Sequence, residues 1–244
     1  PISLLPTLSK ILEKEVARQT LQHLMQNNIL YKWQFGFRPN HSCEHLLHTL
    51  MGNLFESQNK GNSTLAVFID LKKAFDTVDF SILLRKLEFY GFGGVELELM
   101  RNYLMYRYQY TDIDGVLSDF AEILAGVPQG SVLGPLLFLI YINDFPFSTE
   151  FSSFLFADDT SLLLSGKDFK ILQDKAQAKL NRVEEWFNAN KMQINSKKTR
   201  FILFNLSKRR RSEPFEIMLG GERLCRVSRG GRGEICSFGG SSVR

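Results

Sequence analysis

The sequence has few cysteines, no long apolar run and no internal repeat. Its 244 residues include only three Cys, with no metal-ligand pairing, so reduced thiols are expected; they are Cys43, Cys225 and Cys236. Residues 123–143 are uncharged and long enough to span a bilayer. Pro128, Gly130 and Pro135 interrupt this stretch, however, and leave Leu136–Ile142 as its unbroken apolar run. We therefore expect no membrane-spanning segment.

An excess of charge of one sign is also missing. The net charge is +4, and residues 206–244 alone hold nine Lys or Arg and four Glu. Residues 1–205 hold 21 basic and 22 acidic residues, so overall charge does not argue for nucleic-acid binding by the main body. A hydrophobic share of 44% is ordinary for a soluble globular protein of one or two domains. Because the chain starts at Pro1 without a signal peptide, we expect a piece of something longer.

Hydrophobic periodicity predicts helices and strands that succeed one another along most of the chain. Helix N-caps are expected at Ser42, Asp79 and Asp168, and a hairpin turn at Asp114-Gly115. Strands packed against helices on one side indicate an α+β fold. The expected helices are 8–26, 43–60, 80–90, 95–105, 131–143 and a long one after 168; the expected strands are 64–69, 107–113, 119–125, 151–156, 160–164 and 199–204.

A pair of adjacent carboxylates, Asp158 and Asp159, stands at the centre of the pattern. The apolar runs Phe151–Phe156 and Thr160–Leu164 favour extended strand, so the pair is expected at the tip of a β-hairpin. Adjacent aspartates repel each other and are costly beside apolar strands unless a cation neutralises them. They are natural oxygen ligands for Mg²⁺ or Mn²⁺, although the pair alone also fits a solvated surface turn.

A third carboxylate, Asp70, ends the apolar strand Thr64–Ile69. If this strand and the hairpin are neighbours in one sheet, the three carboxylates converge on one edge. Such an arrangement can hold two divalent ions about 3.5–4 Å apart, which activate an attacking hydroxyl and stabilise the leaving oxygen in phosphoryl transfer. The alternative is a strand-end aspartate unrelated to a surface turn.

Three stretches in order resemble successive motifs of reverse transcriptases: Phe68–Asp79, Gly126–Pro135 and Phe156–Asp159. Gln34-Phe-Gly-Phe-Arg38 and Asn195-Ser-Lys-Lys-Thr199 resemble flanking motifs of the same family. With Phe-Ala-Asp-Asp in place of Tyr-Met-Asp-Asp or Tyr-Ala-Asp-Asp, and Gly-Phe-Arg upstream, the chain is most similar to polymerases of non-LTR (long interspersed element) retrotransposons. The resemblance covers about residues 1–205, and it is specific because the motifs occur together and in order.

The resemblance implies an α+β fold of the right-hand polymerase type, with an antiparallel palm sheet backed by helices and a partly helical fingers region. Residues 1–63 would form the fingers and residues 64–205 the palm with inserted finger elements. Residues 206–244 would be the remnant of a primer-gripping turn followed by a basic, Gly-rich tail, for which we expect disorder. Phe215–Leu224 resembles the start of that turn, but Cys225–Arg244 does not continue it and reads like out-of-frame or decayed sequence.

The activity that the resemblance implies is RNA-directed DNA polymerisation. The substrates would be an RNA template, a DNA primer and dNTPs, and the cofactor two Mg²⁺ ions, with Mn²⁺ as a substitute. Asp70 and Asp158 would bridge the two metals, Asp159 would complete the triad, and the carbonyl of Leu71 would add a ligand.

Further residues match positions that hold the incoming nucleotide. Phe75 matches the steric gate, an aromatic ring that would clash with a ribose 2′-OH and so select dNTPs. Lys73 and Ala74 would offer backbone N–H groups to the triphosphate. Gln129 would contact the nucleotide, and Gly130 would let the backbone approach it closely. The alternative for Phe75 is an ordinary core residue.

Two cations complete the predicted site. Arg38 matches a fingers residue that neutralises phosphate, a role suited to its fork of donors. Lys198 matches a late-motif lysine that would protonate the pyrophosphate leaving group, with Lys197 as an adjacent rival. The alternative for Arg38 and Lys198 is an exposed, solvated cation.

The sequence holds no endonuclease domain, zinc knuckle or complete thumb, which the full element protein would be expected to have. Action in the nucleus is implied only by the family's habit of priming at chromosomal DNA. Two rival hypotheses remain. One is a truncated, inactive copy that at most binds nucleic acid. The other is an RNA-dependent RNA polymerase, although those enzymes usually carry a polar residue in place of Phe75 and Gly-Asp-Asp in place of Ala157-Asp158-Asp159.

Overall fold

A five-stranded sheet forms the centre of the protein in this computed structural model, which describes residues 6–204 and 214–227. The expected disorder of Gly230–Arg244 lies outside those residues. The strand order is β13-β10-β1-β8-β7, antiparallel throughout except for the β13–β10 pair. The strands are β1 (Ser63–Ile69), β7 (Ser152–Phe156), β8 (Asp159–Gly166), β10 (Arg200–Phe204) and β13 (Cys225–Arg226).

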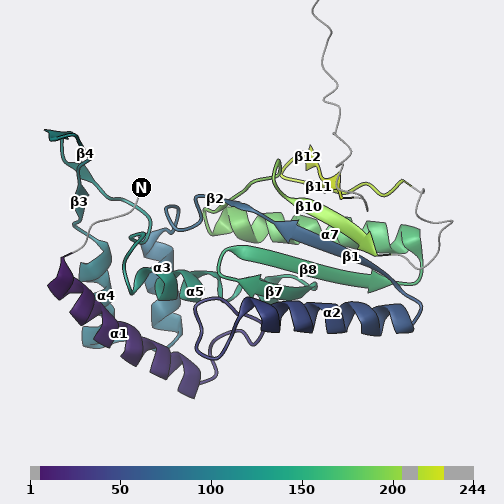
Figure 1. Cartoon of the computed structure of the whole chain (residues 1–244), viewed down its shortest axis with the longest axis horizontal. Helices are drawn as coiled ribbons and strands as arrows, with labels where there is room; N and C mark the ends of the chain where they lie inside the picture. The colour runs from purple at the N-terminus through teal and green to yellow at the C-terminus, as the bar shows by residue number, and fades with distance from the viewer. Residues whose placement is uncertain (1–5, 205–213, 228–244) are drawn as a thin grey trace, which may run out of the picture.

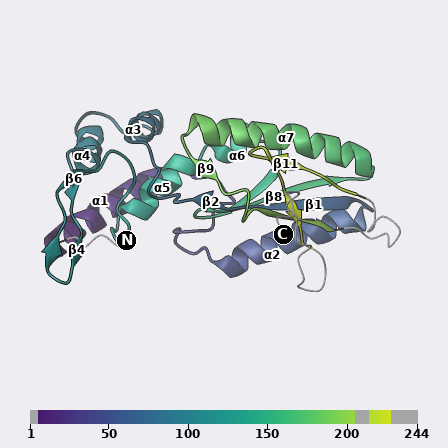
Figure 2. The same ribbon diagram turned by 90° about the horizontal axis from the view of Figure 1, so that it is seen from above.

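Helices cover both faces of this sheet, so the prediction of helices on one side only is wrong. α7 (Phe169–Ala189) packs on one face and α2 (Cys43–Asn59) on the other, as Figures 1 and 2 show. The reason lies in β1, where Leu65 and Val67 join the core cluster under α7, while Ala66 joins a second cluster under α2. A strand that is apolar on both faces needs two covering layers.

The remaining helices lie beside one end of the sheet (Figure 1), apart from Phe145–Ser148, which packs against α7. They are α1 (Thr7–Gln26), α3 (Phe80–Phe89), α4 (Gly94–Leu104), α5 (Gly134–Ile142) and α6 (Phe145–Ser148). Every residue from Leu136 to Ile142 is buried, so α5 is a core helix, as predicted, although it begins at Gly134 and not at residue 131.

Short strands pair outside the main sheet. β2 pairs with β9, β3 with β6, β4 with β5, and β11 with β12. β3 to β6 form the predicted hairpin, with Asp114 (φ 52°) and Gly115 (φ 84°) in its turn. The strands are β2 (Leu71–Lys72), β3 (Tyr108–Gln109), β4 (Asp112–Ile113), β5 (Val116–Leu117), β6 (Ala121–Glu122), β9 (Gln193–Ile194), β11 (Met218–Leu219) and β12 (Glu222–Arg223).

The predicted helix N-caps are confirmed. The side chains of Ser42, Asp79 and Asp168 each accept a hydrogen bond from the backbone N–H three residues later. The apolar stripe predicted for α1 is only partly buried, because Leu8 and Ile11 in its first half are 80% and 62% exposed. The residues around a helix start thus determine where it begins, whereas the burial of its apolar side chains depends on which other segments pack against it.

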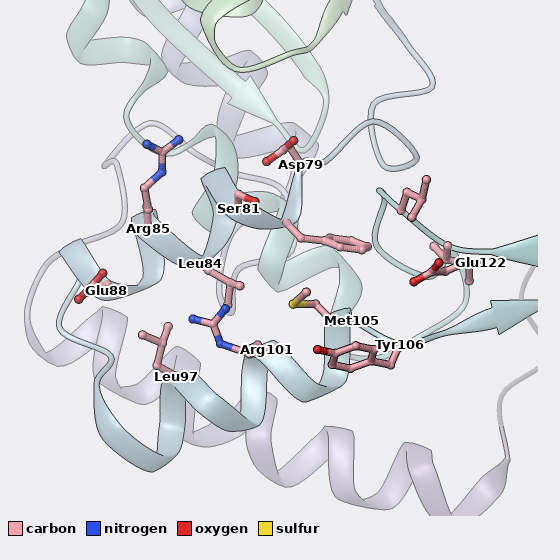
Figure 3. Close-up of a pocket in the computed structure, with 13 residues that line it drawn as sticks. Asp79, Ser81, Leu84, Arg85, Glu88, Leu97, Arg101, Met105, Tyr106 and Glu122 are labelled. Carbon is pink, nitrogen blue, oxygen red and sulfur yellow. The ribbon is translucent and has the colours of Figure 1, made fainter.

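A hollow of about 410 Å³ lies between α3 and α4, and residues 122–124 line one side of it. Ser81 and Arg85 of α3 and Arg101 of α4 are among its lining side chains (Figure 3). None of the residues predicted to bind metal or nucleotide lines this hollow.

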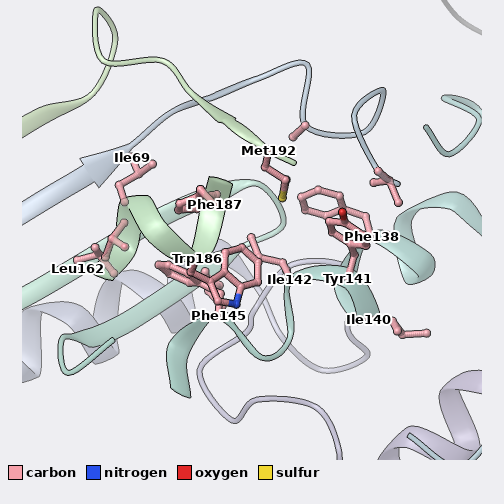
Figure 4. Close-up of a cluster of buried hydrophobic side chains, with 14 of the residues drawn as sticks. Ile69, Phe138, Ile140, Tyr141, Ile142, Phe145, Leu162, Trp186, Phe187 and Met192 are labelled. Atoms are coloured by element: carbon pink, nitrogen blue, oxygen red, sulfur yellow. The ribbon is translucent and has the colours of Figure 1, made fainter. Parts of the chain in front are cut away.

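The larger core cluster joins α5, α6 and α7 to the sheet. Phe145 of α6 meets Trp186 and Phe187 of α7 with ring centroids 5.1 and 5.0 Å apart, and Figure 4 shows these rings beside Ile69 and Leu162. Aromatic pairs at such distances add stability beyond the area that they bury. This packing holds the end of β1 against the helices.

A buried carboxylate, Glu13, ties α1 to the segment that leads into α5. Its side chain is only 4% exposed, and its Oε2 accepts hydrogen bonds from the backbone N–H groups of Val132 (2.7 Å) and Leu133 (3.2 Å). The two N–H groups belong to Leu133, the N-cap residue of the following helix, and to the residue before it, so the carboxylate serves as a cap supplied from a distant helix.

We predict that Glu13→Ala lowers the free energy of unfolding by about 1–3 kcal/mol, because two backbone donors lose their acceptor. Urea unfolding followed by circular dichroism measures the change. The matched control is Glu15→Ala in the same helix, which removes an exposed ion pair with Arg18 and should leave the urea midpoint close to the wild-type value. Equal midpoints for the two variants would contradict the capping role.

Candidate active site at the edge of the central sheet

The register between β1 and β8 brings two of the predicted carboxylates together. Ile69 pairs with Thr160, so Asp70 and Asp159 follow on neighbouring strands at the same edge of the sheet. The backbone of Asp70 is held from the other side, because its N–H donates to Thr199 Oγ1 (3.2 Å) and its C=O accepts from Asn195 N–H (2.8 Å). Thr199 is fully buried. The expectation that these strands are neighbours is confirmed.

The third carboxylate lies in the turn between β7 and β8. Phe156 pairs with Asp159, which leaves Ala157 and Asp158 as the two turn residues. Ala157 has φ 56°, in the left-handed region that two-residue hairpin turns require. The predicted hairpin is therefore confirmed, with Asp158 at its tip and Asp159 as the first residue of β8.

The carboxylates at this edge repel one another. Partial burial raises the pKa of Asp159, and the charges of Asp158 and Asp70 raise it further. In residues 6–204 and 214–227 no group of three or more His, Cys, Asp or Glu side chains is arranged so that it could hold a metal ion. The three aspartates thus lie near one another and their charges repel, but they are not arranged as a preformed metal site.

This donor set suits a hard divalent cation. Carboxylate oxygens are the ligands that Mg²⁺ and Mn²⁺ prefer, and a cation between Asp70, Asp158 and Asp159 would relieve the repulsion that raises the pKa of Asp159. The residues present therefore fit magnesium, in charge and in donor type.

A cleft of about 440 Å³ opens beside the hairpin tip and gathers most of the predicted nucleotide-binding residues. Its lining is drawn from four loops or turns, from β2 and from the start of α5: Phe37, Leu71, Lys73, Ala74, Phe75, Pro128, Gln129, Gly130, Pro135 and Asp158. Segments that range from residue 37 to residue 158 thus meet around one carboxylate.

Two of these loops are locked together. Val127 N–H donates to the C=O of Phe75 (2.9 Å), and Gln129 Nε2 donates to Asp76 Oδ1 (2.8 Å). Gly126 has φ 90°, and a Cβ there would lie 2.8 Å from the carbonyl oxygen of Asp76, so only glycine fits this approach. The side chain of Gln129, predicted to contact nucleotide, is therefore held by Asp76 in this structure.

Phe75, the predicted steric gate, is half-buried with one face on the core. Its ring stacks on Phe138 of α5 at 4.5 Å and 28°, and meets Phe37 edge-on at 6.4 Å. The turn that carries it begins at Lys73, whose φ is 50° and whose C=O accepts from the N–H groups of Asp76 and Thr77. The aromatic ring is thus a rigid wall of the cleft.

The two predicted cations lie outside the cleft lining. Arg38 donates through Nη1 to the carbonyls of Tyr31 (2.9 Å) and Gln34 (3.3 Å), and burial lowers the pKa of its guanidinium. Lys198 is exposed, as is its neighbour Lys197. The phosphate contact of Arg38 and the acid role of Lys198 stay predictions.

Sequence reasoning did not single out Gln34 as a functional side chain. It is 2% exposed, and its Oε1 accepts from the N–H groups of Gly36 (2.9 Å) and Ala157 (3.1 Å). The sequence offered one signal, since Gln34 opens the stretch that resembles a flanking motif, but nothing local connects it with a turn that is 123 residues away.

Comparisons with known proteins agree on one family. The model described as "Reverse transcriptase (RNA-dependent DNA polymerase)" matches residues 1–222. The RNA-directed DNA polymerase from mobile element jockey of Drosophila melanogaster is 30% identical over 212 residues, which are 84% of this chain and 23% of that protein. The probable RNA-directed DNA polymerase from transposon X-element of the same species is 32% identical over 214 residues, 86% of this chain and 24% of that protein. The chain thus spans about a quarter of the length of these relatives.

Solved structures support the same fold. The apo telomerase from Candida Tropicalis truncated from its C-terminal domain has a TM-score of 0.59 at 15% identity, over 89% of this chain and 43% of that one. Telomerase from Candida albicans, solved in complex with a fragment of telomeric RNA, has a TM-score of 0.58 at 15% identity, over 86% of this chain and 36% of that one. The predicted α+β polymerase fold is confirmed.

We predict that Asp159→Asn raises the urea midpoint at neutral pH in the presence of a chelator, because it removes one of three repelling charges. A carboxyl whose pKa is raised by folding costs the folded state stability at pH values above that pKa, and costs nothing once it is protonated in both states. The gain should therefore shrink as the pH falls toward the ordinary carboxyl pKa. The matched control is Asp174→Asn, since Asp174 is an exposed residue of α7. A gain that stays constant with pH would contradict the repulsion.

Proposed function

Because the chain belongs to the reverse transcriptase (RNA-dependent DNA polymerase) family, we propose that it is the catalytic part of an RNA-directed DNA polymerase of a non-LTR retrotransposon. The observation that carries the proposal is the position of Asp70, Asp158 and Asp159 at one edge of the sheet, with Asp158 in the lining of a cleft that Phe75 also lines. In this proposal residues 1–63 are fingers, residues 64–205 are palm, and residues 206–244 are a remnant of the primer-gripping region and tail.

The three aspartates would hold two Mg²⁺ ions, with Mn²⁺ as a substitute and with the carbonyl of Leu71 as a further ligand. When bound, such ions lower the pKa of an attacking hydroxyl and neutralise charge that develops on phosphoryl oxygens. Asp70, Asp158 and Asp159 would each offer a carboxylate to the ions, and the ions would relieve the repulsion that raises the pKa of Asp159.

The cleft residues would bind and orient a dNTP. Backbone N–H groups of Lys73 and Ala74 would face its triphosphate, since consecutive amides in a turn make an anion-binding nest. Phe75, fixed by its stack on Phe138, would stand against the sugar and leave no room for a 2′-OH. Gln129 and Gly130 would border the nucleotide from the opposite loop.

Two cations would act from the rim. The predicted phosphate contact of Arg38 requires its guanidinium to leave the carbonyls of Tyr31 and Gln34, a shift that nucleotide binding would have to drive. Lys198, or its neighbour Lys197, would donate a proton to the pyrophosphate leaving group. Both lysines are exposed and unconstrained enough to turn toward the cleft.

The partners in this proposal are an RNA template and a DNA primer. The thumb and endonuclease regions would be supplied by other parts of the element protein, and the place of action would be the nucleus. No helix among the described residues combines the length and apolar character needed to cross a bilayer.

The direct test is dTTP incorporation on a poly(rA) template primed with oligo(dT), in Mg²⁺ or Mn²⁺. We expect the wild type to incorporate dTTP and Asp158→Asn to incorporate it at least about 100-fold more slowly. The loss of a charge that would hold metal should cost about as much as the loss of other electrostatic groups in active sites. Equal incorporation by both proteins would refute the site. If both are silent, this chain is a copy that has lost its activity.

We predict that Phe75→Ala relaxes sugar selection, because the ring that would meet a 2′-OH is gone. The measurement is the ratio of kcat/KM for dTTP to that for UTP, which should fall in the variant by roughly 10-fold or more. Phe37→Ala, which removes a neighbouring ring of the same wall but keeps the predicted gate, is the matched control. Preference of the wild type for UTP would instead favour an RNA polymerase.

A further inference from the structure

A buried amide, Gln34, joins the N-terminal part of the chain to the turn that carries Asp158. We propose that Gln34 is a positioning residue, whose amide oxygen fixes the backbone of Ala157 and so sets the direction in which Asp158 meets a divalent cation. The inference rests on the proposed function of the site, because it concerns the same metal-binding carboxylate.

The first observation is the hydrogen bond itself. Oε1 of Gln34 accepts from the N–H of Ala157 at 3.1 Å, and the same oxygen accepts from Gly36 N–H at 2.9 Å, which fixes the orientation of the amide. Ala157 has φ 56°, a conformation that a residue with a side chain adopts only when its surroundings enforce it. Gln34 supplies the only hydrogen bond that Ala157 N–H makes within the described part of the chain.

The second observation is the way in which the loop docks. Phe35 N–H donates to the C=O of Leu155 (2.8 Å), and Leu155 N–H donates to the C=O of Trp33 (3.0 Å), so the loop pairs in parallel with the edge of β7. This pairing places Gln34 opposite Leu155, two residues before Ala157. A side chain on such a docked loop can hold the turn without moving itself.

The third observation is the fit of Gly36 against the turn. A Cβ on Gly36 would overlap the backbone nitrogen of Ala157 and approach the carbonyl carbon of Phe156 to 3.0 Å. The loop at Gly36 therefore lies directly against the Ala157 turn and leaves no space for a side chain between them. Glycine is needed here for space and not for its backbone angles.

One feature of the amide argues that its oxygen matters more than its nitrogen. Nε2 of Gln34 is buried and has no hydrogen-bond partner. An unpaired buried donor is unfavourable, so a purely structural role would be served as well by an apolar side chain. An acceptor is needed at this place because the N–H of the turn would otherwise be buried and unpaired as well.

The consequence for the site follows from the order of the residues. Ala157 immediately precedes Asp158, so the orientation of the peptide at Ala157 governs where the Asp158 carboxylate points. The hydrogen bond to Gln34 and the close approach of Gly36 hold this peptide in one orientation. Partners that orient metal ligands in this way change metal affinity by about 10- to 100-fold.

The test compares three variants of the full chain. Gln34→Met keeps the length of the side chain but lacks the acceptor, and Gly36→Ala places a methyl group against the same peptide nitrogen. Tyr31→Phe is the matched control, because it removes a hydrogen bond from the same loop to the same strand (Tyr31 hydroxyl to Ser153 C=O, 3.1 Å) but far from the turn.

Two measurements do not depend on polymerase activity. Mn²⁺ affinity is obtained by titration with electron paramagnetic resonance, and amide protection of residues 155–158 by hydrogen exchange with mass spectrometry. We expect Gln34→Met and Gly36→Ala to weaken Mn²⁺ binding by about 10-fold or more and to lose protection at 155–158, while Tyr31→Phe matches the wild type in both. If Gln34→Met fails to fold, the comparison of Gly36→Ala with Tyr31→Phe in both measurements decides whether the inference holds.

The inference is overturned if Gln34→Met and Gly36→Ala bind Mn²⁺ as Tyr31→Phe does, or if the wild type binds no Mn²⁺ at all. Incorporation of dTTP separates this failure from a failure of the proposed function. A wild type that binds Mn²⁺ with the expected difference between variants, but incorporates nothing, keeps Gln34 as the positioning residue and removes the polymerase proposal.

Discussion

The antiparallel register of β1 and β8 is the constraint on which the site depends. A shift of one residue would turn every side chain of β1 to the opposite face and would separate Asp70 from Asp159. The register is secured by burial on both faces, since Leu65 lies against the core under α7 and Ala66 lies against the core under α2. The position of a few polar atoms at the edge thus follows from apolar packing along the whole strand.

The energy of this packing supports local features that would be unfavourable alone. Three carboxylates share one edge, and two turn residues beside the cleft, Lys73 and Ala157, have left-handed backbone angles. Each is a cost of order 1–3 kcal/mol that the surrounding structure has to sustain. Each is held by contacts with distant segments: the Lys73 turn by the loop at Gly126, the Ala157 turn by Gln34. The turns that border the cleft are therefore held in place by segments far away in the sequence.

What could be predicted from the sequence was chiefly local. The caps at Asp79 and Asp168 involve atoms three residues apart, so residue type and spacing sufficed. The layer of α2 on the second face of the sheet was missed, since the two-sided apolar pattern of β1 does not say which helix will cover it. The partial exposure of α1 was missed for the same reason, because periodicity predicts an apolar stripe but not its partner.

The sequence by itself determined the family, the order of the elements and the chemistry of the candidate site, because motifs, caps and carboxylates are properties of neighbouring residues. Only the tertiary structure decided which groups meet. The contact of Gln34 with Ala157 spans 123 residues, and that of Glu13 with Val132 spans 119. Contacts at such separations depend on how buried surfaces fit together, and no local pattern records that fit.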